Sequence, residues 1–380
     1  MVGAGAFGGW TALDLARRGA RVTLVDAWGP GNARSSSGGE TRVIRAAYGM
    51  RTVYTKMATR ALQLWRDHDR HFRRGFFKRT GALWMFGRDD TFGRSSSATL
   101  RAEKLTMERL TLAEARRRYP QVMFGDVTSV FFEPEAGYLL ARRASEHVVE
   151  CLVGEGGTYL ERAVVSPVRV AGAVLKRVSI TSGQALSADA FVFACGPWLG
   201  TLFPDVVGKA VRSTRQEVFY FGAPAGDGRF LDDALPVWAD FSDRKMYGIP
   251  GNVNRGFKIA DDTPGRSFDP TNGHRHATTA GLKSVRAFLA RRFPALANAP
   301  LVGSEVCQYE ATRDSDYIID RHPGAANVWL VGGGSGHGFK MGPAIGELVA
   351  SLVVGESQPD PHFSLARLAR QPARPLEKWS

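Results

Sequence analysis

The sequence has few cysteines and no long apolar run, and both absences narrow the kind of protein it encodes. Its three cysteines, Cys151, Cys195 and Cys307, are too few and too odd in number for a disulfide framework, so a reducing, cytoplasmic location is expected. The longest apolar stretches, such as 191–194 and 328–331, are strand-sized and fall well short of the roughly 18 residues of a membrane span. No basic and then apolar leader opens the chain, so no secretory signal and no membrane partner are expected.

The sequence also lacks a metal-binding or hydrolytic constellation. His68 and His71 share one face of an expected helix, but no third ligand accompanies them in this basic stretch, and both are interpreted as surface residues. Neither a G-x-S-x-G elbow nor a cysteine–histidine signature occurs. No metal is therefore expected.

Positive charge is in excess, because 50 Lys and Arg stand against 37 Asp and Glu and give a formal net charge of +13. Such a balance favours contact with polyanions through counterion release. The densest basic run, 66–79, includes aspartates and falls largely on an expected helix, where such residues usually form a solvated face. Because no recognisable nucleic-acid module accompanies the charge, no nucleic-acid partner is expected.

The first residues carry the strongest local signal, a G-x-G-x-x-G formed by Gly3, Gly5 and Gly8. A helical pattern follows, and then a strand pattern, 21–25, that ends at Asp26. In a dinucleotide-binding unit the glycines allow a tight turn and close approach of the pyrophosphate to a helix N-terminus, while the acid holds a ribose hydroxyl. This pattern favours FAD or NAD, and a glycine turn without a ligand is the alternative.

The first strand of this unit is expected to be very short. Only Met1 and Val2 precede Gly3, whereas an ordinary strand has about 5 residues.

The rest of the chain alternates helical and strand patterns without repeats or a low-complexity linker. A length of 380 residues exceeds what one core usually serves, so two domains are expected. Helices are expected at 57–74, from Thr111 with a capping box to Glu114, and at 143–154, 277–292 and 342–354. Strands are expected at 82–86, 158–160, 163–170, 174–180, 189–194, 306–310, 317–319 and 328–331. An antiparallel sheet is expected from 215–221, 235–241, 245–249 and 256–260.

Six motifs occur in order along nearly the whole chain. They are Gly3-x-Gly5-x-x-Gly8 with Asp26, Thr41-Arg42-x-x-Arg45, Ala194-x-Gly196-x-Trp198, Cys307-x-Tyr309, Asp320-x-His322-Pro323 and Ser335-Gly336-His337-Gly338-Phe339-Lys340. Together they resemble the monomeric sarcosine oxidase family of the D-amino-acid-oxidase-like superfamily. That family includes N-methyltryptophan and pipecolate oxidases and is related to Amadori-product oxidases.

The resemblance implies an α/β fold, α+β overall, in which a glutathione-reductase-like FAD-binding Rossmann domain interleaves with an antiparallel-sheet catalytic domain. The FAD-binding domain is expected to comprise 1–85, 143–214 and 305–380, and the catalytic domain 86–142 and 215–304.

The activity implied by the resemblance is FAD-dependent oxidation of a C–N bond in a secondary or N-alkyl amino acid or related amine. Hydride passes to the flavin, and O2 is reduced to H2O2. A flavin dehydrogenase with another acceptor, an Amadori-product oxidase, an NAD enzyme and a non-catalytic basic binding protein are the alternatives. The expected partners are a small amine or amino-acid substrate and O2, and the chain is expected to be a monomer or a dimer.

The resemblance implies roles for several residues that match motifs of the family. Cys307 matches the cysteine that joins FAD through a thioether, and a small buried strand residue is the alternative. Cys151 and Cys195 lack that context and are interpreted as core packing. Arg42 is expected beside the flavin ring, where a cation stabilises the anionic reduced flavin.

Other residues match the positions that handle the substrate and O2 in this family. Arg45 and Lys340 match the pair that binds the substrate carboxylate, a role suited to a bidentate guanidinium and an opposing ammonium. Lys258 matches the lysine that activates O2 electrostatically. For all three, a solvated surface cation is the alternative. Tyr247 and Tyr309 match aromatic positions that pack against a small amine.

Two positions depart from the sarcosine-type pattern. Asp262 stands where those enzymes have a histidine, so the site either receives a cationic group there or differs in its loop. Gly38 stands where they have a His-His pair, which leaves more room and hints at a substrate bulkier than sarcosine.

The residues expected to bind FAD come from the whole length of the chain. His337 among them is expected either to hydrogen-bond near the flavin or to be structural. The set is Gly3, Gly5, Ala6, Phe7, Gly8, Asp26, Ser36, Thr41, Arg42, Val165, Gly196, Trp198, Cys307, Gly336, His337, Gly338, Phe339 and Lys340.

Overall fold

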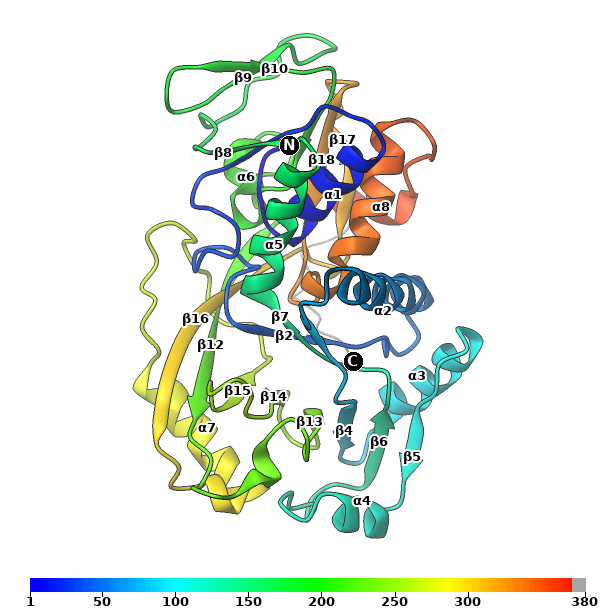
Figure 1. Cartoon of the computed structure of the whole chain (residues 1–380), viewed down its shortest axis with the longest axis vertical. Coiled ribbons are helices and arrows are strands. Elements are labelled where there is room, and N and C mark those ends of the chain that lie inside the picture. The colour runs from blue at the N-terminus through cyan, green and yellow to red at the C-terminus, as the bar shows by residue number, and fades with distance from the viewer. Residues whose placement is uncertain (371–380) are drawn as a thin grey trace.

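The computed structural model describes residues 1–370, and its upper part in Figure 1 is a nucleotide-binding layer. Four parallel segments form the centre of this layer. They are β8 (Thr158–Glu161), β1 (Thr23–Asp26), β11 (Phe191–Phe193) and β18 (Val328–Gly332), with β17 (Ile318–Arg321) added antiparallel at the edge. Val2 bridges in parallel to both Val25 and Phe193, so the expected short first strand is a single bridged residue.

Three helices pack against one another beside these strands: α1 (Ala6–Arg17), α5 (Ala141–Gly154) and α8 (Gly342–Val353). The contact between α1 and α8 is close because glycine replaces a side chain there. A Cβ atom on Gly346 would lie 2.8 Å from the carbonyl carbon of Trp10. The closeness of these helices fixes the N-terminus of α1 beside the ends of the strands.

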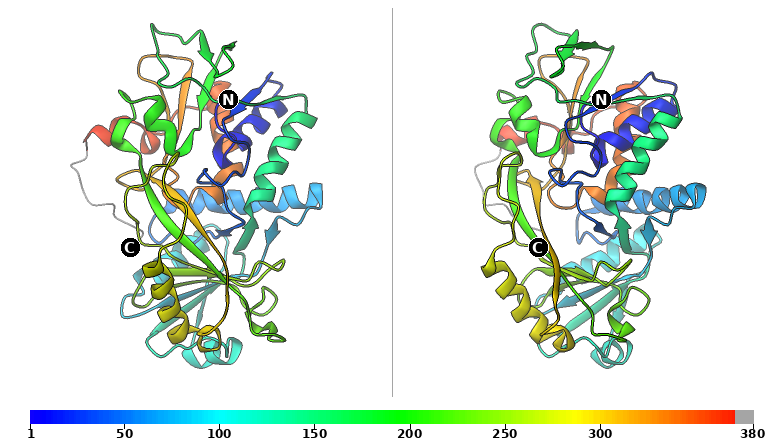
Figure 2. Two further views of the ribbon diagram at one scale, coloured as in Figure 1. Left: turned by 90° about the vertical axis from the view of Figure 1, so that its left-hand side faces the viewer. Right: turned by 60° about the vertical axis from the view of Figure 1, so that its left-hand side comes forward.

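The lower part of the molecule is an eight-stranded sheet. Its order is β16 (Leu301–Ala311), β12 (Arg212–Phe221), β15 (Phe257–Asp261), β14 (Met246–Ile249), β13 (Val237–Phe241), β4 (Ala82–Phe86), β6 (Ser129–Glu133) and β5 (Glu108–Leu110). The long strands β12 and β16 run from the nucleotide-binding layer down into this sheet (Figures 1 and 2). This one pair of strands therefore contributes residues to both parts of the molecule.

The four segments expected to form an antiparallel sheet, now β12, β13, β14 and β15, do pair antiparallel, whereas β4, which was not among them, joins β13 in parallel. All other neighbours in the sheet are antiparallel. The two parallel strands come from distant parts of the chain, so a long crossover, rather than a hairpin, joins them. The proposed domain boundaries remain a prediction.

Strand alternation gives the large sheet two different faces. Leu83 and Met85 of β4 pack into a core with α7 (Thr279–Arg292), whereas Trp84 and Phe86 face the core that α1 and α2 (Thr52–Phe72) share. In β15, Ile259 joins the first of these cores and its neighbour Lys258 points to the opposite face. The face that carries Trp84 and Lys258 is the face toward the nucleotide-binding layer.

The remaining elements are short and complete the two parts. A three-stranded sheet has the order β2 (Thr41–Ile44), β7 (Gly137–Leu140) and β3 (Phe77–Lys78). The other helices and strands are α3 (Thr91–Ala102), α4 (Leu112–Arg118), α6 (Leu199–Leu202), α9 (Ala366–Arg370), β9 (Arg177–Ser179) and β10 (Ala185–Ser187). Helix α4 begins at the capping box of Thr111 and Glu114, as expected. Within the described residues no helix is long and apolar enough to cross a membrane.

The strand expected over 163–170 is absent from the described structure, where only Val164 forms a bridge, to Ile180. Pro167 lies in the middle of this segment and has no N–H to donate, which interrupts a strand ladder. The strand expected over 174–180 is correspondingly reduced to β9.

The assignment of His68 to the surface was wrong. Its side chain is buried and packs against Trp10 and Phe72, at ring-centroid distances of 4.7 and 4.5 Å. Burial lowers the pKa of His68 to about 3. Together with Ala61 and Trp65 it forms the apolar stripe by which α2 packs. His71, one helical turn further on, is exposed as expected.

Candidate active site

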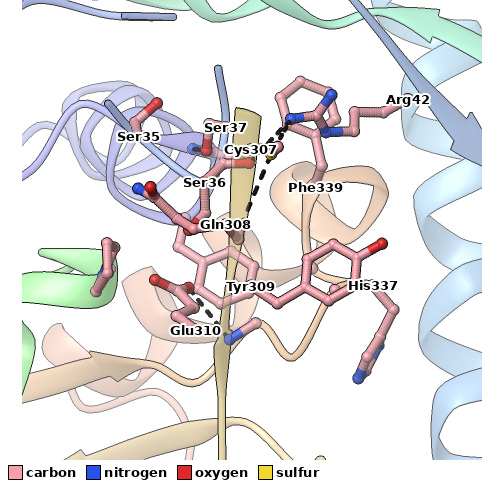
Figure 3. A pocket seen from close by; sticks show the side chains of 18 of the residues that line it. Ser35, Ser36, Ser37, Arg42, Cys307, Gln308, Tyr309, Glu310, His337 and Phe339 are labelled. Carbon is pink, nitrogen blue, oxygen red and sulfur yellow. Dashed lines mark hydrogen bonds between the residues drawn. The ribbon is translucent and has the colours of Figure 1, made fainter. Parts of the chain in front are cut away.

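One large cavity runs between the nucleotide-binding layer and the large sheet, and most of the predicted site residues line it. Figure 3 shows part of its wall, where Ser35, Ser36 and Ser37 lie on one side and β16 presents Cys307 to Glu310. Residues from the two ends and the middle of the sequence therefore meet around one space.

The glycine motif shapes the nucleotide end of the cavity. Gly3 has φ +100°, and a Cβ atom there would lie 2.3 Å from the carbonyl oxygen of Ala194. A Cβ atom on Gly8 would lie 1.9 Å from the carbonyl oxygen of Gly3. These two glycines therefore allow the strand and helix to approach, whereas Gly5 borders the cavity itself.

Asp26 ends β1 at the same end of the cavity, as the sequence predicts. Its carboxylate accepts hydrogen bonds from the backbone N–H groups of Ala4 at 2.7 Å and Trp28 at 2.9 Å. Burial raises the pKa of this carboxyl group. Two carboxylate oxygens offer about four acceptor sites, so lone pairs remain for a ribose hydroxyl.

Arg42 and Cys307 meet in the middle of the cavity. The guanidinium Nη2 lies 3.1 Å from the Cys307 sulfur, and it also donates to the carbonyl oxygen of Gly38. Arg42 belongs to β2 and Cys307 belongs to β16, so their contact joins two different sheets.

Lys258 is almost completely buried, with 1% of its surface exposed, so it is not a solvated strand lysine. Its ammonium group donates to the carbonyl oxygen of Thr41 at 2.7 Å. Burial, together with the positive charge of Arg42, lowers its pKa to about 7. The lysine therefore sits close to the midpoint of its titration at neutral pH.

Arg45 and Lys340 line the same cavity as the glycine motif. The guanidinium of Arg45 stacks 4.3 Å from the ring centroid of Tyr48 and 5.3 Å from that of Trp84. Lys340 is buried, and its ammonium group donates to the carbonyl oxygen of His337 at 2.9 Å. Burial, and then the positive charge of Arg45, lowers the pKa of Lys340 far below its usual range. Neither residue is the solvated cation that was considered as an alternative.

Tyr309, Tyr247 and Asp262 form a polar corner of the same cavity. The Tyr309 hydroxyl donates to the Asp262 carboxylate at 2.8 Å. Burial and the charge of Asp262 raise the pKa of Tyr247 to about 12. The departure noted at position 262 therefore places a carboxylate in the cavity wall, beside two phenols that stay neutral at physiological pH.

His337 lines the cavity, but its ring is held by the protein. Its Nδ1 lies 2.6 Å from the Tyr317 hydroxyl, and its Nε2 lies 3.0 Å from the carbonyl oxygen of Ser315. Burial lowers the pKa of the imidazole well below its usual value, so the ring is neutral. These contacts favour the structural interpretation of His337.

The structure does not bring three of the predicted cofactor residues to the cavity: Gly8, Thr41 and Val165. Gly8 and Thr41 are buried, and Thr41 contributes its carbonyl oxygen to Lys258. Val165 is 48% exposed, while its neighbours Val164 and Ser166 line the cavity. Side chains alternate along an extended segment, so a shift of one residue decides which ones face the ligand.

Of the three cysteines, only Cys151 is a plain core residue. It is buried in α5, as expected. Cys195 is partly buried and also lines the cavity, with its sulfur 3.6 Å from the carbonyl oxygen of Val2.

Two buried glutamates near the cavity were missed by sequence reasoning. Glu133 accepts hydrogen bonds from the backbone of Ala46 at 2.5 Å and of Ala47 at 3.2 Å, directly after Arg45. Glu310 lies in the cavity wall on β16. Nothing local marks either residue, because their importance comes from burial, and burial here depends on strands paired far along the chain.

Comparison with known proteins agrees with this arrangement. The sequence profile described as "FAD dependent oxidoreductase" matches residues 1–352. The chain belongs to the FAD dependent oxidoreductase family. It is therefore an enzyme of that family, with 30% identity to the monomeric sarcosine oxidase of Bacillus sp. (strain NS-129), covering 97% of this chain and 96% of the relative. It is 28% identical to the N-methyl-L-tryptophan oxidase of Salmonella typhi, covering 97% and 98% of the two chains.

The fold of the family is equally clear from solved structures. L-proline dehydrogenase from P. horikoshii superposes with a TM-score of 0.84 at 21% identity, covering 97% of this chain and 96% of that chain. At 21% identity this similarity shows the fold alone, and it confirms the expected α/β architecture.

The residues present in this FAD dependent oxidoreductase fit FAD. The Ser36 hydroxyl and the Glu310 Oε2 atom are buried in the cavity wall without a hydrogen-bond partner among the described residues. A Cβ atom on Gly5 would lie 3.1 Å from the Ser37 hydroxyl, so this glycine keeps the wall open beside the start of α1. Gly5, Asp26, Ser36 and Arg42 are the residues that would hold the dinucleotide along the cavity.

Proposed function

We propose that this chain oxidises a C–N bond of a secondary or N-alkyl amino acid, with O2 as the acceptor and H2O2 as a product. The observation that carries the proposal is the placement of the half-buried Arg45 and the buried Lys340 in the same cavity as the glycine motif and Asp26. Both residues border the cavity, where a guanidinium and an opposing lysine suit the carboxylate of a substrate. Relatives named sarcosine oxidase and N-methyl-L-tryptophan oxidase support an amino acid alkylated on nitrogen.

Arg45 and Lys340 bind and orient the substrate in this proposal. Arg45 contacts the rings of Tyr48 and Trp84, so its guanidinium group is positioned before the substrate arrives. Holding the carboxylate at one end places the reacting carbon at a constant distance from the cofactor, which is an orientation effect. FAD, when bound, supplies the acceptor for the hydride.

Tyr309 and Asp262 act at the amine end of the substrate. The Tyr309 hydroxyl donates to Asp262, so a hydrogen bond positions the carboxyl group in the cavity wall. A carboxylate in the wall attracts a protonated amine or a second cationic group of the substrate. The extra room expected at Gly38 is not found: Gly38 does not border the cavity, and a Cβ atom there would lie 2.3 Å from the carbonyl oxygen of Asn32.

Lys258 supplies a positive charge from the sheet side of the cavity. Its buried ammonium group stabilises negative charge that develops on O2, an electrostatic effect that a dry site strengthens. Cys307, whose sulfur contacts Arg42, is the proposed point of covalent FAD attachment.

The experiment that tests the proposal follows O2 uptake and peroxide release by the purified protein. The substrates are sarcosine, N-methyl-L-tryptophan and a cyclic amino acid, each compared with its methyl ester, which lacks the negative charge. We expect a flavin spectrum, and turnover of the acids in preference to the esters. Turnover with an artificial acceptor but not with O2 would make the enzyme a dehydrogenase, and turnover of fructosyl amino acids alone would favour the Amadori-type alternative.

A further inference from the structure

Glu310 is a buried carboxyl group that the proposed reaction does not use. It lies on β16, with 7% of its surface exposed. Its Oε1 atom accepts a hydrogen bond from the backbone N–H of Gly334 at 3.1 Å, and this contact is drawn in Figure 3. Its Oε2 atom is buried without a hydrogen-bond partner among the described residues, although it borders the cavity.

Two glycines make room for this carboxyl group. A Cβ atom on Gly196 would lie 2.5 Å from Oε2, and one on Gly334 would lie 2.9 Å from Oε1. Gly196 follows β11 and Gly334 follows β18, so the carboxyl group sits at the carboxyl ends of two neighbouring parallel strands. In doubly wound sheets that edge is where ligands bind.

The surroundings of Glu310 favour its neutral form. No ion pair joins it to a cation in the part of the chain that the structure describes. Burial raises its pKa to about 7, opposed only by the Gly334 hydrogen bond. A neutral carboxylic acid has one O–H to donate, and a buried O–H without an acceptor costs free energy.

The other titratable groups around Glu310 do not change charge near neutral pH. From the end of β11, Cys195 faces it, and burial raises the pKa of that thiol. From the glycine-rich turn, His337 is kept neutral by burial. On β12 the residue opposite is Ser213, which carries no charge. Lys258, further along the cavity, is the one described side chain that shares a pKa of about 7.

We propose that Glu310 is an additional FAD ligand, which enters the complex protonated and donates a hydrogen bond from Oε2 to an oxygen of the dinucleotide. The proposal rests on the family's cofactor and goes beyond the proposed reaction. A dinucleotide presents phosphate and hydroxyl oxygens, and its negative phosphates oppose an ionised carboxylate in the same pocket. FAD binding therefore takes up a proton whenever Glu310 is ionised in the free protein.

The test measures FAD affinity as a function of pH. The full chain carrying Cys307→Ser, which keeps binding reversible, is stripped of flavin and titrated with FAD while flavin fluorescence is followed. We expect the dissociation constant to rise as pH increases above about 7, approaching tenfold per pH unit. Glu310→Gln, which keeps a donor but does not titrate, is expected to bind more tightly than the parent at about pH 8.5 and to lose that part of the slope.

Three comparisons make the result decisive. Glu217→Gln, on the neighbouring strand and outside the cavity lining, controls for a Glu-to-Gln change and is expected to keep the parent slope. Lys258 is present in every variant, so its own titration cancels in the difference between parent and Glu310→Gln. Glu310→Ala removes the donor and is expected to bind FAD at least tenfold more weakly at low pH.

Equal pH slopes in the parent and in Glu310→Gln would overturn the proposal. Affinity that instead improves with pH in the parent alone would show an ionised carboxylate that accepts from a hydroxyl, and would overturn it too. If Glu310→Gln does not fold, proton uptake on FAD binding to the parent that also carries Lys258→Met decides: about one proton is expected at about pH 8.5, and none contradicts the proposal. Failure of the parent to bind FAD at all would instead remove the proposed function.

Discussion

The guanidinium group of Arg42 lies 3.1 Å from the sulfur of Cys307, although the two residues are 265 positions apart in the chain. The contact places a permanent positive charge beside the one cysteine that stands between the glycine motif and the substrate cations. The sulfur of Cys195, which also lines the cavity, instead contacts the carbonyl oxygen of Val2. The contact with Arg42 therefore distinguishes Cys307 from Cys195, although both cysteines line the same cavity.

Cys307→Ser is expected to abolish covalent attachment of FAD while the protein keeps its fold. The reason is that serine has no sulfur and cannot form the thioether. The measurement is the flavin absorbance of pellet and supernatant after acid precipitation. Cys195→Ser is the matched control and should leave flavin in the pellet; flavin that stays with precipitated Cys307→Ser would rule out this attachment point.

Arg45→Met and Lys340→Met are each expected to lower kcat/KM for an amino acid, mainly through a higher KM. Each change removes a charged contact with the carboxylate of roughly 2–3 kcal/mol, which corresponds to about 30-fold or more. Steady-state kinetics with the acid and with its methyl ester separate this effect from a general loss of activity. An equal loss with both substrates would contradict the carboxylate role.

Lys258→Met is expected to slow the step with O2 about 100-fold, while the step with the amine changes little. The pKa of Lys258 is about 7, so its charge is present below that pH and lost above it. The O2 rate of the wild type should therefore fall as pH rises through the pKa, whereas that of the variant should be flat. Negative charge on a bound cofactor moves the midpoint upward and leaves the direction unchanged. Rapid mixing of reduced enzyme with O2 measures the rate, and a flat wild-type profile would remove the role.

Glu133→Gln is expected to lower the free energy of unfolding by about 1–3 kcal/mol and also to raise KM. Glu133 is 1% exposed, and it accepts from the backbone after Arg45 and from the Trp84 indole at 3.2 Å. An amide is a weaker acceptor and brings a donor into a site built from donors. Urea unfolding gives the stability, and KM for an acid gives the effect on Arg45. Lower stability with unchanged KM would make Glu133 purely structural.

Asp262→Asn is expected to change which amines are oxidised and to leave the preference for a carboxylate intact. The substitution removes the negative charge beside the amine end but keeps an oxygen that can accept from Tyr309. Relative kcat/KM values for amino acids with and without a second cationic group are the measurement, and Tyr309→Phe is the companion variant. An unchanged ranking of substrates would show that position 262 does not set specificity.

The sequence by itself determined the local units of this protein. The G-x-G-x-x-G at Gly3, the strand ending at Asp26 and the capping box at Thr111 all have the expected structure, because each depends on residues close together in the chain. Strand and helix positions such as 82–86 and 342–354 follow for the same reason, since hydrophobic period is a local property. The motif order also led to the correct family.

Only the tertiary structure decided which distant residues meet and which side chains are buried. The parallel pairing of β13 with β4, the burial of His68, and the outward side of Val165 depend on register and packing that no short window encodes. Glu133 and Glu310 look like ordinary charged strand residues in the sequence. They become functional candidates because the assembled sheets exclude water around them, and burial changes the energy of a carboxyl group more than its sequence neighbours do.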